Sequence, residues 1–244
     1  FTHTIFAMPF ALVGYMTALS HNSHIPFSWK LLGLVVLCMV FARNSAMGFN
    51  RYADRDIDAK NERTTSREIP AGKITSNSAL WFVIVNCVLF IATTWFINPI
   101  CFYLSPVALV VILGYSITKR FTALCHLVLG IGLGLAPVGA WLAVTGRFEM
   151  LPVWFGIAVL FWVSGFDVIY SLQDQEFDKT NKLHSIPALI GKRNALNLSR
   201  IMHLLSATCI WFGGIFGNFG ILYYVGALFF TAALLYQHRI VKHD

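Results

Sequence analysis

The sequence predicts an all-α integral membrane protein: a bundle of eight transmembrane helices built as two four-helix halves around a central cavity. Of the 244 residues, 57% are hydrophobic and only 12% are charged, whereas charged residues make up about 25% of a typical soluble domain. The apolar stretches recur at roughly 20 residues, the length that a helix needs to cross a bilayer. Two similar polar segments follow the second and the sixth stretch, which predicts the division into halves.

Turn-forming residues separate the apolar stretches from one another. The eight predicted spans are Phe1–Ser20, Trp29–Phe49, Ala79–Ile97, Ile100–Ile117, Leu124–Val144, Leu151–Leu172, Ser199–Phe216 and Leu222–Gln237. They predict a single transmembrane domain over residues 1–244, with polar motif loops at about 50–78 and 172–198.

The basic residues predict the orientation of the chain in the membrane. Lys and Arg gather after the second, fourth and sixth spans and at the C-terminal end, whereas the other side has only Lys30 and Arg147. Because cytoplasmic loops carry an excess of Lys and Arg, we expect the motif loops to face the cytoplasm, in a bacterial inner membrane. This asymmetry also explains the net charge of +7, so we expect no nucleic acid as a partner.

A repeated pair of aspartates supports a duplicated architecture. In each motif two Asp residues lie four positions apart, and an Ile-Pro dipeptide follows. The pairs are Asp54 with Asp58 and Asp174 with Asp178. Repeats of this kind often form a site at the interface between the halves.

The acidic residues are concentrated in these two motif segments, which hold nine of the eleven. The spacing of Asn50, Asp54 and Asp58 would place an amide and two carboxylates on one face of a helix, where like charges repel each other. A magnesium ion reverses that penalty, because it binds carboxylate and phosphate oxygens. With Asp174 and Asp178 as a second half-site, the motifs could hold two Mg²⁺ ions and a bridging diphosphate, and so make diphosphate a leaving group.

Basic residues near the motifs could bind the phosphate oxygens. Arg63, Arg67 and Lys119 are suited to this role, although each also fits a simple anchor on the positive side of the membrane. Arg43 lies within the second span, about 10 Å deeper than Asn50 if the helix is regular. An Arg inside a membrane indicates a function, and here it could bind the carboxylate of an acceptor; the alternative is snorkelling or a structural hydrogen bond.

Other possible sites are less well supported. The glycine-rich run at 129–134 superficially resembles a dinucleotide-binding loop, but it lies inside an apolar span, where glycines favour close helix packing. The five cysteines occur singly and the histidines form no HExxH motif, so we expect neither a disulfide framework nor a zinc site.

The motifs resemble those of a known family. Residues 50–64 and 174–178 carry NxxxDxxxD and DxxxD, which resemble the two signatures of the UbiA superfamily of membrane prenyltransferases, and residues 115–119 resemble its YxxxK element. Residues 165–174 and 183–187 are similar to the 4-hydroxybenzoate polyprenyltransferase branch, above all to its menaquinone-pathway members. The similarity extends over nearly the whole chain.

The resemblance implies a function and a set of site residues. It implies Mg²⁺-dependent transfer of a polyprenyl group from polyprenyl diphosphate to an aromatic acid, 4-hydroxybenzoate or a dihydroxynaphthoate, in quinone biosynthesis. The implied steps are ionisation to an allylic cation and attack by the ring at a position ortho to its hydroxyl. The implied catalytic residues and metal ligands are Asp54, Asp58, Asp174 and Asp178, with Asn50 as a further ligand. The expected substrate-binding residues are Asn50, Arg63, Arg67, Tyr115, Lys119, Arg43 and Asp167.

The resemblance also bears on the extent of the fold. Members of the superfamily usually have nine spans, so we expect a ninth helix outside this sequence. We infer no obligate protein partner besides the lipid bilayer and the substrates.

Two other classes of membrane protein remain as alternatives. A cation-coupled transporter would place its acidic residues near the middle of helices, and only Asp167 approaches that depth. A CDP-alcohol phosphatidyltransferase also uses magnesium and paired aspartates, but its DGxxAR element is absent from this sequence.

Overall fold

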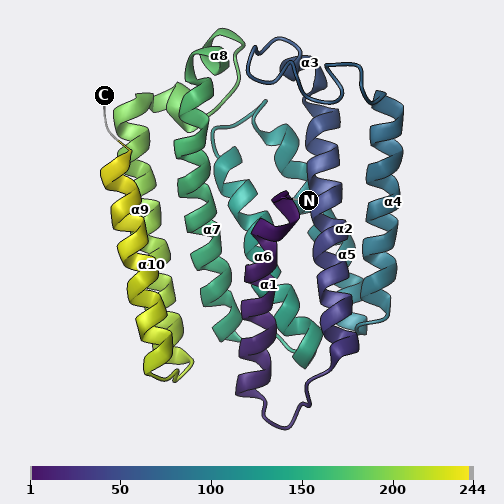
Figure 1. Ribbon diagram of the computed structural model, residues 1–244, viewed down its shortest axis with the longest axis vertical. Helices are drawn as coiled ribbons and strands as arrows, with labels where there is room; N and C mark the ends of the chain where they lie inside the picture. The colour runs from purple at the N-terminus through teal and green to yellow at the C-terminus, as the bar shows by residue number, and fades with distance from the viewer. Residues whose placement is uncertain (1, 242–244) are drawn as a thin grey trace.

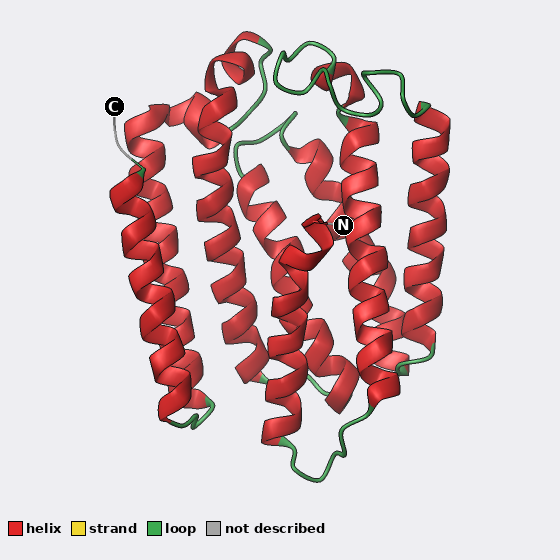
Figure 2. Ribbon diagram, in the orientation of Figure 1, coloured by secondary structure: helices red, strands yellow, loops and turns green. Residues whose placement is uncertain are grey.

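A bundle of long helices forms the protein in a computed structural model that describes residues 2–241, with side chains from residue 7 onward (Figure 1). No strand occurs within residues 2–241 (Figure 2). The elements are α1 (Thr2–His21), α2 (Trp29–Ala53), α3 (Arg55–Asp58), α4 (Ser76–Trp95), α5 (Pro99–Thr118), α6 (Cys125–Thr145), α7 (Met150–Ser171), η1 (Leu172–Asp174), α8 (Gln175–Thr180), α9 (Ile186–Phe216) and α10 (Ile221–Ile240). Helix α6 lies at the centre and contacts α1, α2, α5 and α7.

Seven of the described helices are long and apolar enough to cross a membrane: α2, α4, α5, α6, α7 with its extension, α9 and α10. The all-α integral membrane class is therefore confirmed. Helix α1 lies where the first span was predicted but is not among the seven. The count of eight spans, the two-halves layout and the single-domain assignment stay predictions.

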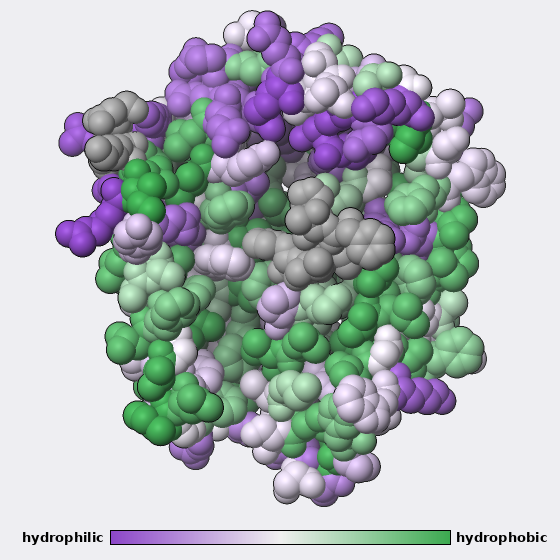
Figure 3. Space-filling model, viewed as in Figure 1, coloured by the Kyte–Doolittle hydropathy of each residue, from purple (hydrophilic) through white to green (hydrophobic). Residues whose placement is uncertain are grey.

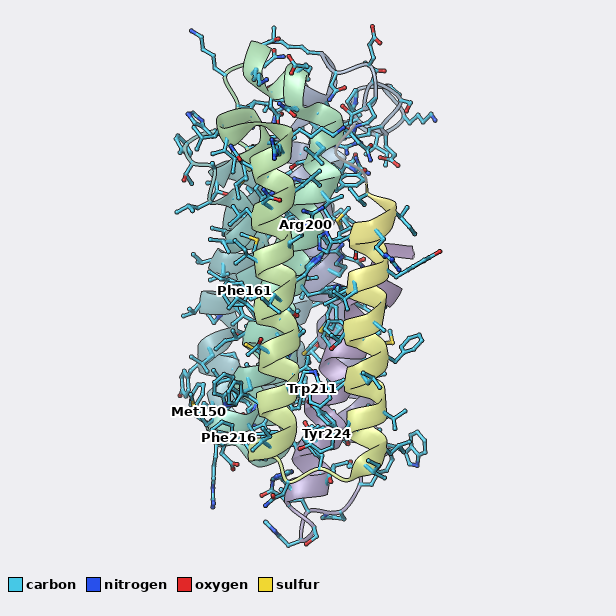
Figure 4. All side chains as sticks on the ribbon, turned by 90° about the vertical axis from the view of Figure 1, so that its left-hand side faces the viewer. Met150, Phe161, Arg200, Trp211, Phe216 and Tyr224 are labelled. Atoms are coloured by element: carbon cyan, nitrogen blue, oxygen red, sulfur yellow. The ribbon has the colours of Figure 1, made fainter. Side chains whose placement is uncertain are left out.

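Polar residues cluster at one end of the bundle. Figure 3 shows hydrophilic residues gathered where α3 and α8 lie, above a mainly hydrophobic body. In Figure 4, Arg200 lies toward this end, whereas Phe216 and Tyr224 lie at the opposite end. Basic residues at one end and aromatic residues at an edge are typical of a protein that spans a bilayer.

Several helices begin at residues that cap their free backbone N–H groups. The side chains of Ser28, Thr75 and Asn98 accept hydrogen bonds from N–H groups in the first turns of α2, α4 and α5. Pro99 follows Asn98 at the start of α5, where its missing N–H costs nothing. These local signals explain why the observed helices begin near the predicted span limits.

Helix α9 begins earlier than predicted. The predicted loop at about 172–198 contains α8, and α9 already begins at Ile186, where Ser185 caps it. A kink follows at Gly191, whose φ of 78° favours glycine. A search for apolar stretches missed this part of the helix because it is rich in polar and charged residues.

Two glycines of the run at 129–134 lie against the backbone of α7. A Cβ at Gly130 would lie 2.4 Å from the Leu160 carbonyl oxygen, and one at Gly134 would lie 2.6 Å from that of Gly156. Neither space admits a methyl group, so the predicted role in helix packing agrees with the geometry.

We expect Gly134→Ala to lower the thermal unfolding midpoint of the purified protein in detergent. The added methyl group forces the two backbones apart, at a cost of about 1–3 kcal/mol. Gly139→Ala is the matched control on the same helix, because no atom lies within 4 Å of its Cβ position. Equal midpoints for the two variants would contradict the packing role of Gly134.

Candidate active site

The first motif continues the path of α2 past the end of the helix. Asp54 follows Ala53 with φ −91° and ψ 4°, and its backbone N–H donates to the Asn50 carbonyl at 2.9 Å. The Asp58 N–H donates to the Asp54 carbonyl at 2.7 Å. Although the regular helix breaks at Asp54, the four-residue spacing persists, and the Asn50 side-chain amide donates to Asp54 at 3.0 Å.

The second motif forms in a similar way where α7 ends. Asp174 closes the 3₁₀ turn η1 with φ −104° and ψ 7°, close to the angles of Asp54. Asp178 lies in α8 and is fully buried. The leading aspartates of the two motifs thus share a backbone conformation.

Arg63 and Asn61, from the loop after the first motif, bind Asp174 of the second. The Arg63 guanidinium forms a bidentate ion pair with the Asp174 carboxylate, with Nε 2.9 Å from Oδ1. The Asn61 side chain donates to the same oxygen at 2.9 Å, and Arg63 also donates to the Tyr170 hydroxyl at 3.1 Å. These contacts join the two motifs into one site.

The other three motif aspartates also lie beside cations. Arg67 Nη1 donates to both carboxylate oxygens of Asp58, at 2.7 and 2.8 Å. The other two pairs are Lys119 with Asp178, at 2.6 Å, and Arg120 with Asp54, at 3.8 Å. Each carboxylate is thus balanced by a positive side chain.

Asp178 is the most constrained of the four carboxylates. Its side chain has no exposed area, and neither oxygen receives a well-aligned hydrogen bond from the described residues. Its compensation is the charge of Lys119, whose own side chain is 34% exposed. A buried carboxylate with a single partner is costly, so a further cation beside it would be stabilising.

Partial burial also affects Asp54. Loss of water raises the pKa of its carboxyl to about 6, and the nearby Asp58 carboxylate adds to the rise, while Arg120 and Lys119 oppose it. A cation that approached this carboxylate would replace the lost solvation.

A polar cavity of about 640 Å³ lies beneath the motifs. Ten of the eleven predicted site residues line it. They are Arg43, Asn50, Asp54, Asp58, Arg63, Arg67, Tyr115, Lys119, Asp167 and Asp174. Asp178 is not among the lining residues, because it lies buried behind Lys119.

A second cavity, of about 330 Å³, has an almost wholly apolar lining. Its walls come from α1, α2, α4, α5 and α6, with Phe148 from the turn that follows α6. Arg43, Tyr115, Leu129 and Leu133 line both cavities. A ligand with a polar head and an apolar tail could therefore extend from one into the other.

Sequence reasoning did not single out three side chains that structure the site: Asn61, Arg120 and His126. Asn61 binds Asp174, Arg120 donates to the Ala53 carbonyl, and His126 contacts Asp167. Asn61 and Arg120 lie next to recognised motif residues along the chain, and this proximity could have identified them as site residues. Nothing local marked His126.

The donor atoms of the site suit a metal ion, although no metal site is preformed among the described residues. In residues 2–241 no three His, Cys, Asp or Glu side chains converge into a preformed metal site, since the carboxylates are paired with Arg and Lys. The donor set of four carboxylates and one amide nevertheless fits a hard cation such as Mg²⁺, and the poorly satisfied oxygens of Asp178 favour one.

This geometry defines a class of protein: a membrane-embedded enzyme whose site suits an amphiphilic substrate with an anionic head. The particular family follows from comparison. Residues 7–244 match the UbiA prenyltransferase family, so the chain belongs to that family.

Individual relatives and solved structures agree with this assignment. The chain is 29% identical over 217 residues to the 4-hydroxybenzoate octaprenyltransferase of Vibrio parahaemolyticus, covering 88% of this chain and 76% of that protein. The apo structure of a UbiA homologue from Aeropyrum pernix superposes with a TM-score of 0.90 at 32% identity, covering 98% of this chain and 88% of the other. A UbiA homologue from Archaeoglobus fulgidus bound to GPP and Mg²⁺ shares the fold, with a TM-score of 0.73 at 21% identity, over 96% and 85% of the two chains.

Proposed function

We propose that this protein transfers a polyprenyl group from polyprenyl diphosphate to an aromatic acid in quinone biosynthesis. The acceptor is 4-hydroxybenzoate, with a dihydroxynaphthoate as the alternative. The observation that carries the proposal is the pair of carboxylate motifs above a polar cavity that shares residues with an apolar one. The named relatives support 4-hydroxybenzoate as the first acceptor to test.

The cations of the site are placed to receive the diphosphate. Arg63, Arg67 and Lys119 are paired with motif carboxylates in the structure. An arriving diphosphate offers them stronger acceptors, because Arg binds phosphate through a bidentate fork and Lys as a point charge. We propose that these side chains exchange their carboxylate partners for phosphate oxygens.

The carboxylates that they release would hold the metal. The proposed ligands are Asn50, Asp54 and Asp58 on one side and Asp174 and Asp178 on the other. When bound, Mg²⁺ supplies neutralisation of the negative charge that develops on the diphosphate as the carbon–oxygen bond breaks.

The two cavities provide for the organic parts of the substrates. The apolar cavity suits the prenyl chain, since burial of apolar surface from water is favourable. Arg43 lines both cavities, together with Tyr115, so it can hold the carboxylate of the acceptor near the head of the chain. The ring then attacks the allylic cation at a position ortho to its hydroxyl.

We propose a bacterial inner membrane location, with the motif end facing the cytoplasm. The concentration of basic residues at that end supports this orientation. The transporter alternative loses support, because the motif carboxylates lie at helix ends. They do not lie near the middle of the spans.

The test is prenyl transfer by the purified protein in detergent, with a polyprenyl diphosphate and either acceptor, in Mg²⁺ and in EDTA. We expect prenylated product from one acceptor in Mg²⁺. In EDTA the rate of product formation should fall at least 100-fold, because losing one electrostatic contact to charge that develops in the transition state costs roughly 10²–10³-fold in rate. Product in EDTA at the full rate would refute the metal assignment, and no product with either acceptor would refute the acceptor assignment.

A further inference from the structure

A buried histidine contacts an aspartate that lies apart from the metal motifs. His126, in the first turn of α6, lies with Nδ1 2.6 Å from Oδ2 of Asp167 on α7. The His126 side chain is 3% exposed, whereas that of Asp167 is 30% exposed and lines the polar cavity. His126 lines the same cavity, but Asp167 presents the larger exposed area to it.

The second ring nitrogen of His126 assigns its tautomer. The backbone N–H of Ile186, at the start of α9, donates to Nε2 at 3.2 Å. Nε2 therefore carries the lone pair, and Nδ1 carries the proton and donates to Asp167. The contact of Asp167 with His126 uses Oδ2, which leaves Oδ1 for a ligand in the polar cavity.

The depth of Asp167 separates it from the metal site. It lies seven residues before Asp174, which corresponds to about 10 Å along a helix. Arg43 lies seven residues before Asn50 on α2, and hence at a similar depth below the first motif. Among the described residues that line the cavity, Arg43 supplies a cation and Asp167 a carboxylate, which match an aromatic acid that has a carboxylate and a hydroxyl at different positions on its ring.

We propose that His126 is a positioning residue that orients Asp167 to accept the hydroxyl proton of the aromatic acceptor. The inference rests on the proposed function. As the carbon–oxygen bond to diphosphate breaks and the ring carbon forms the new carbon–carbon bond, the ring hydroxyl transfers its proton to Asp167. The resulting dienone then loses the hydrogen of the alkylated carbon as a proton, and its oxygen regains a proton from Asp167. The net products are prenylated phenol, diphosphate and one proton.

The chain offers variants that separate this role from simple packing. His126→Leu removes the donor to Asp167. His126→Asn keeps an N–H close to the position of Nδ1. Ser164→Ala is the matched control, because the Ser164 hydroxyl donates to the backbone carbonyl of His126 at 3.0 Å and not to the ring.

Two measurements on full-length protein in detergent test the proposal. The first is equilibrium binding of the acceptor that supports turnover and of its analogue without the hydroxyl: 4-hydroxybenzoate with benzoate, or dihydroxynaphthoate with naphthoate. The second is kcat and KM for the acceptor. In the wild type we expect the hydroxylated acid to bind roughly tenfold more tightly, because a hydrogen bond to a charged group discriminates by this amount or more.

The expected pattern depends on the hydroxyl and not on folding alone. His126→Leu should lose the tenfold preference and lower kcat at least tenfold, His126→Asn should recover most of both, and Ser164→Ala should match the wild type. If the wild type forms product and His126→Leu keeps the preference, the inference is overturned while the proposed function stands. If the wild type forms no product with either acceptor, the proposed function is refuted. If the wild type binds the acids with and without the hydroxyl equally well, the inference about His126 is overturned.

Discussion

Replacing Asp174 with Asn is expected to lower prenyl-transfer turnover by roughly 10²–10³-fold, the cost of removing one electrostatic contact to charge that develops in a transition state. The amide keeps the size of the side chain, and its oxygen can still accept hydrogen bonds from Arg63 and Asn61, which bind Asp174 in the structure. The fold should therefore survive while the metal affinity is lost. Product formation over time with saturating substrates and Mg²⁺ measures the effect.

Glu176→Gln is the matched control for this variant. Glu176 belongs to the same motif segment and loses the same charge, but its side chain is 84% exposed and pairs with Lys179. We expect its turnover to stay within about twofold of the wild type, since exposed ion pairs contribute little. Equal turnover in Asp174→Asn and Glu176→Gln would refute the assignment of Asp174 to the metal.

Replacing Lys119 with Met is expected to destabilise the metal-free protein by about 3 kcal/mol. The change leaves Asp178 buried without its cation. Removal of one partner of a buried ion pair costs about 3–5 kcal/mol of stability, and we expect the lower value because Lys119 is partly exposed. Because Mg²⁺ would replace the lost charge, its addition should raise the thermal unfolding midpoint more in Lys119→Met than in the wild type.

Lys179→Met provides the comparison, since Lys179 is 44% exposed and pairs with an exposed glutamate. It should change neither the midpoint nor the response to Mg²⁺. A Lys119→Met variant that is destabilised but does not respond to Mg²⁺ would contradict the placement of a metal beside Asp178.

The sequence was sufficient to predict most of the long helices and ten residues that line the polar cavity. Runs of about 20 apolar residues have few alternatives to a membrane span, so the limits of α2, α4, α5, α6 and α7 were predicted to within a few residues. Motif spacing predicted that Asn50, Asp54 and Asp58 share a side, and all three line the polar cavity. The other lining residues were predicted from their charge, their depth in a span or the family resemblance. The early start of α9 was not predicted, because it depends on the cap at Ser185 and the kink at Gly191 and not on an apolar stretch.

The pairing of charges could not be predicted from spacing. Arg63 and Arg67 are close in the sequence, yet Arg63 binds Asp174 of the second motif and Arg67 binds Asp58 of the first. That choice depends on how the loop after α3 folds across the end of the bundle. The burial of Asp178 away from the cavity and the contact of His126 with Asp167 also arise between helices that are distant in sequence, so no local pattern indicates them.

The nearly equal backbone angles of Asp54 and Asp174 have a consequence for the shape of the ligand that suits this site. Two chain turns of the same form present their leading carboxylates at the ends of two different helices. The motif end of the polar cavity therefore offers carboxylate metal ligands twice. A diphosphate is itself two similar phosphoryl groups on either side of one bridging oxygen. We therefore expect a ligand with two phosphoryl groups to engage both turns, whereas a monophosphate could engage only one.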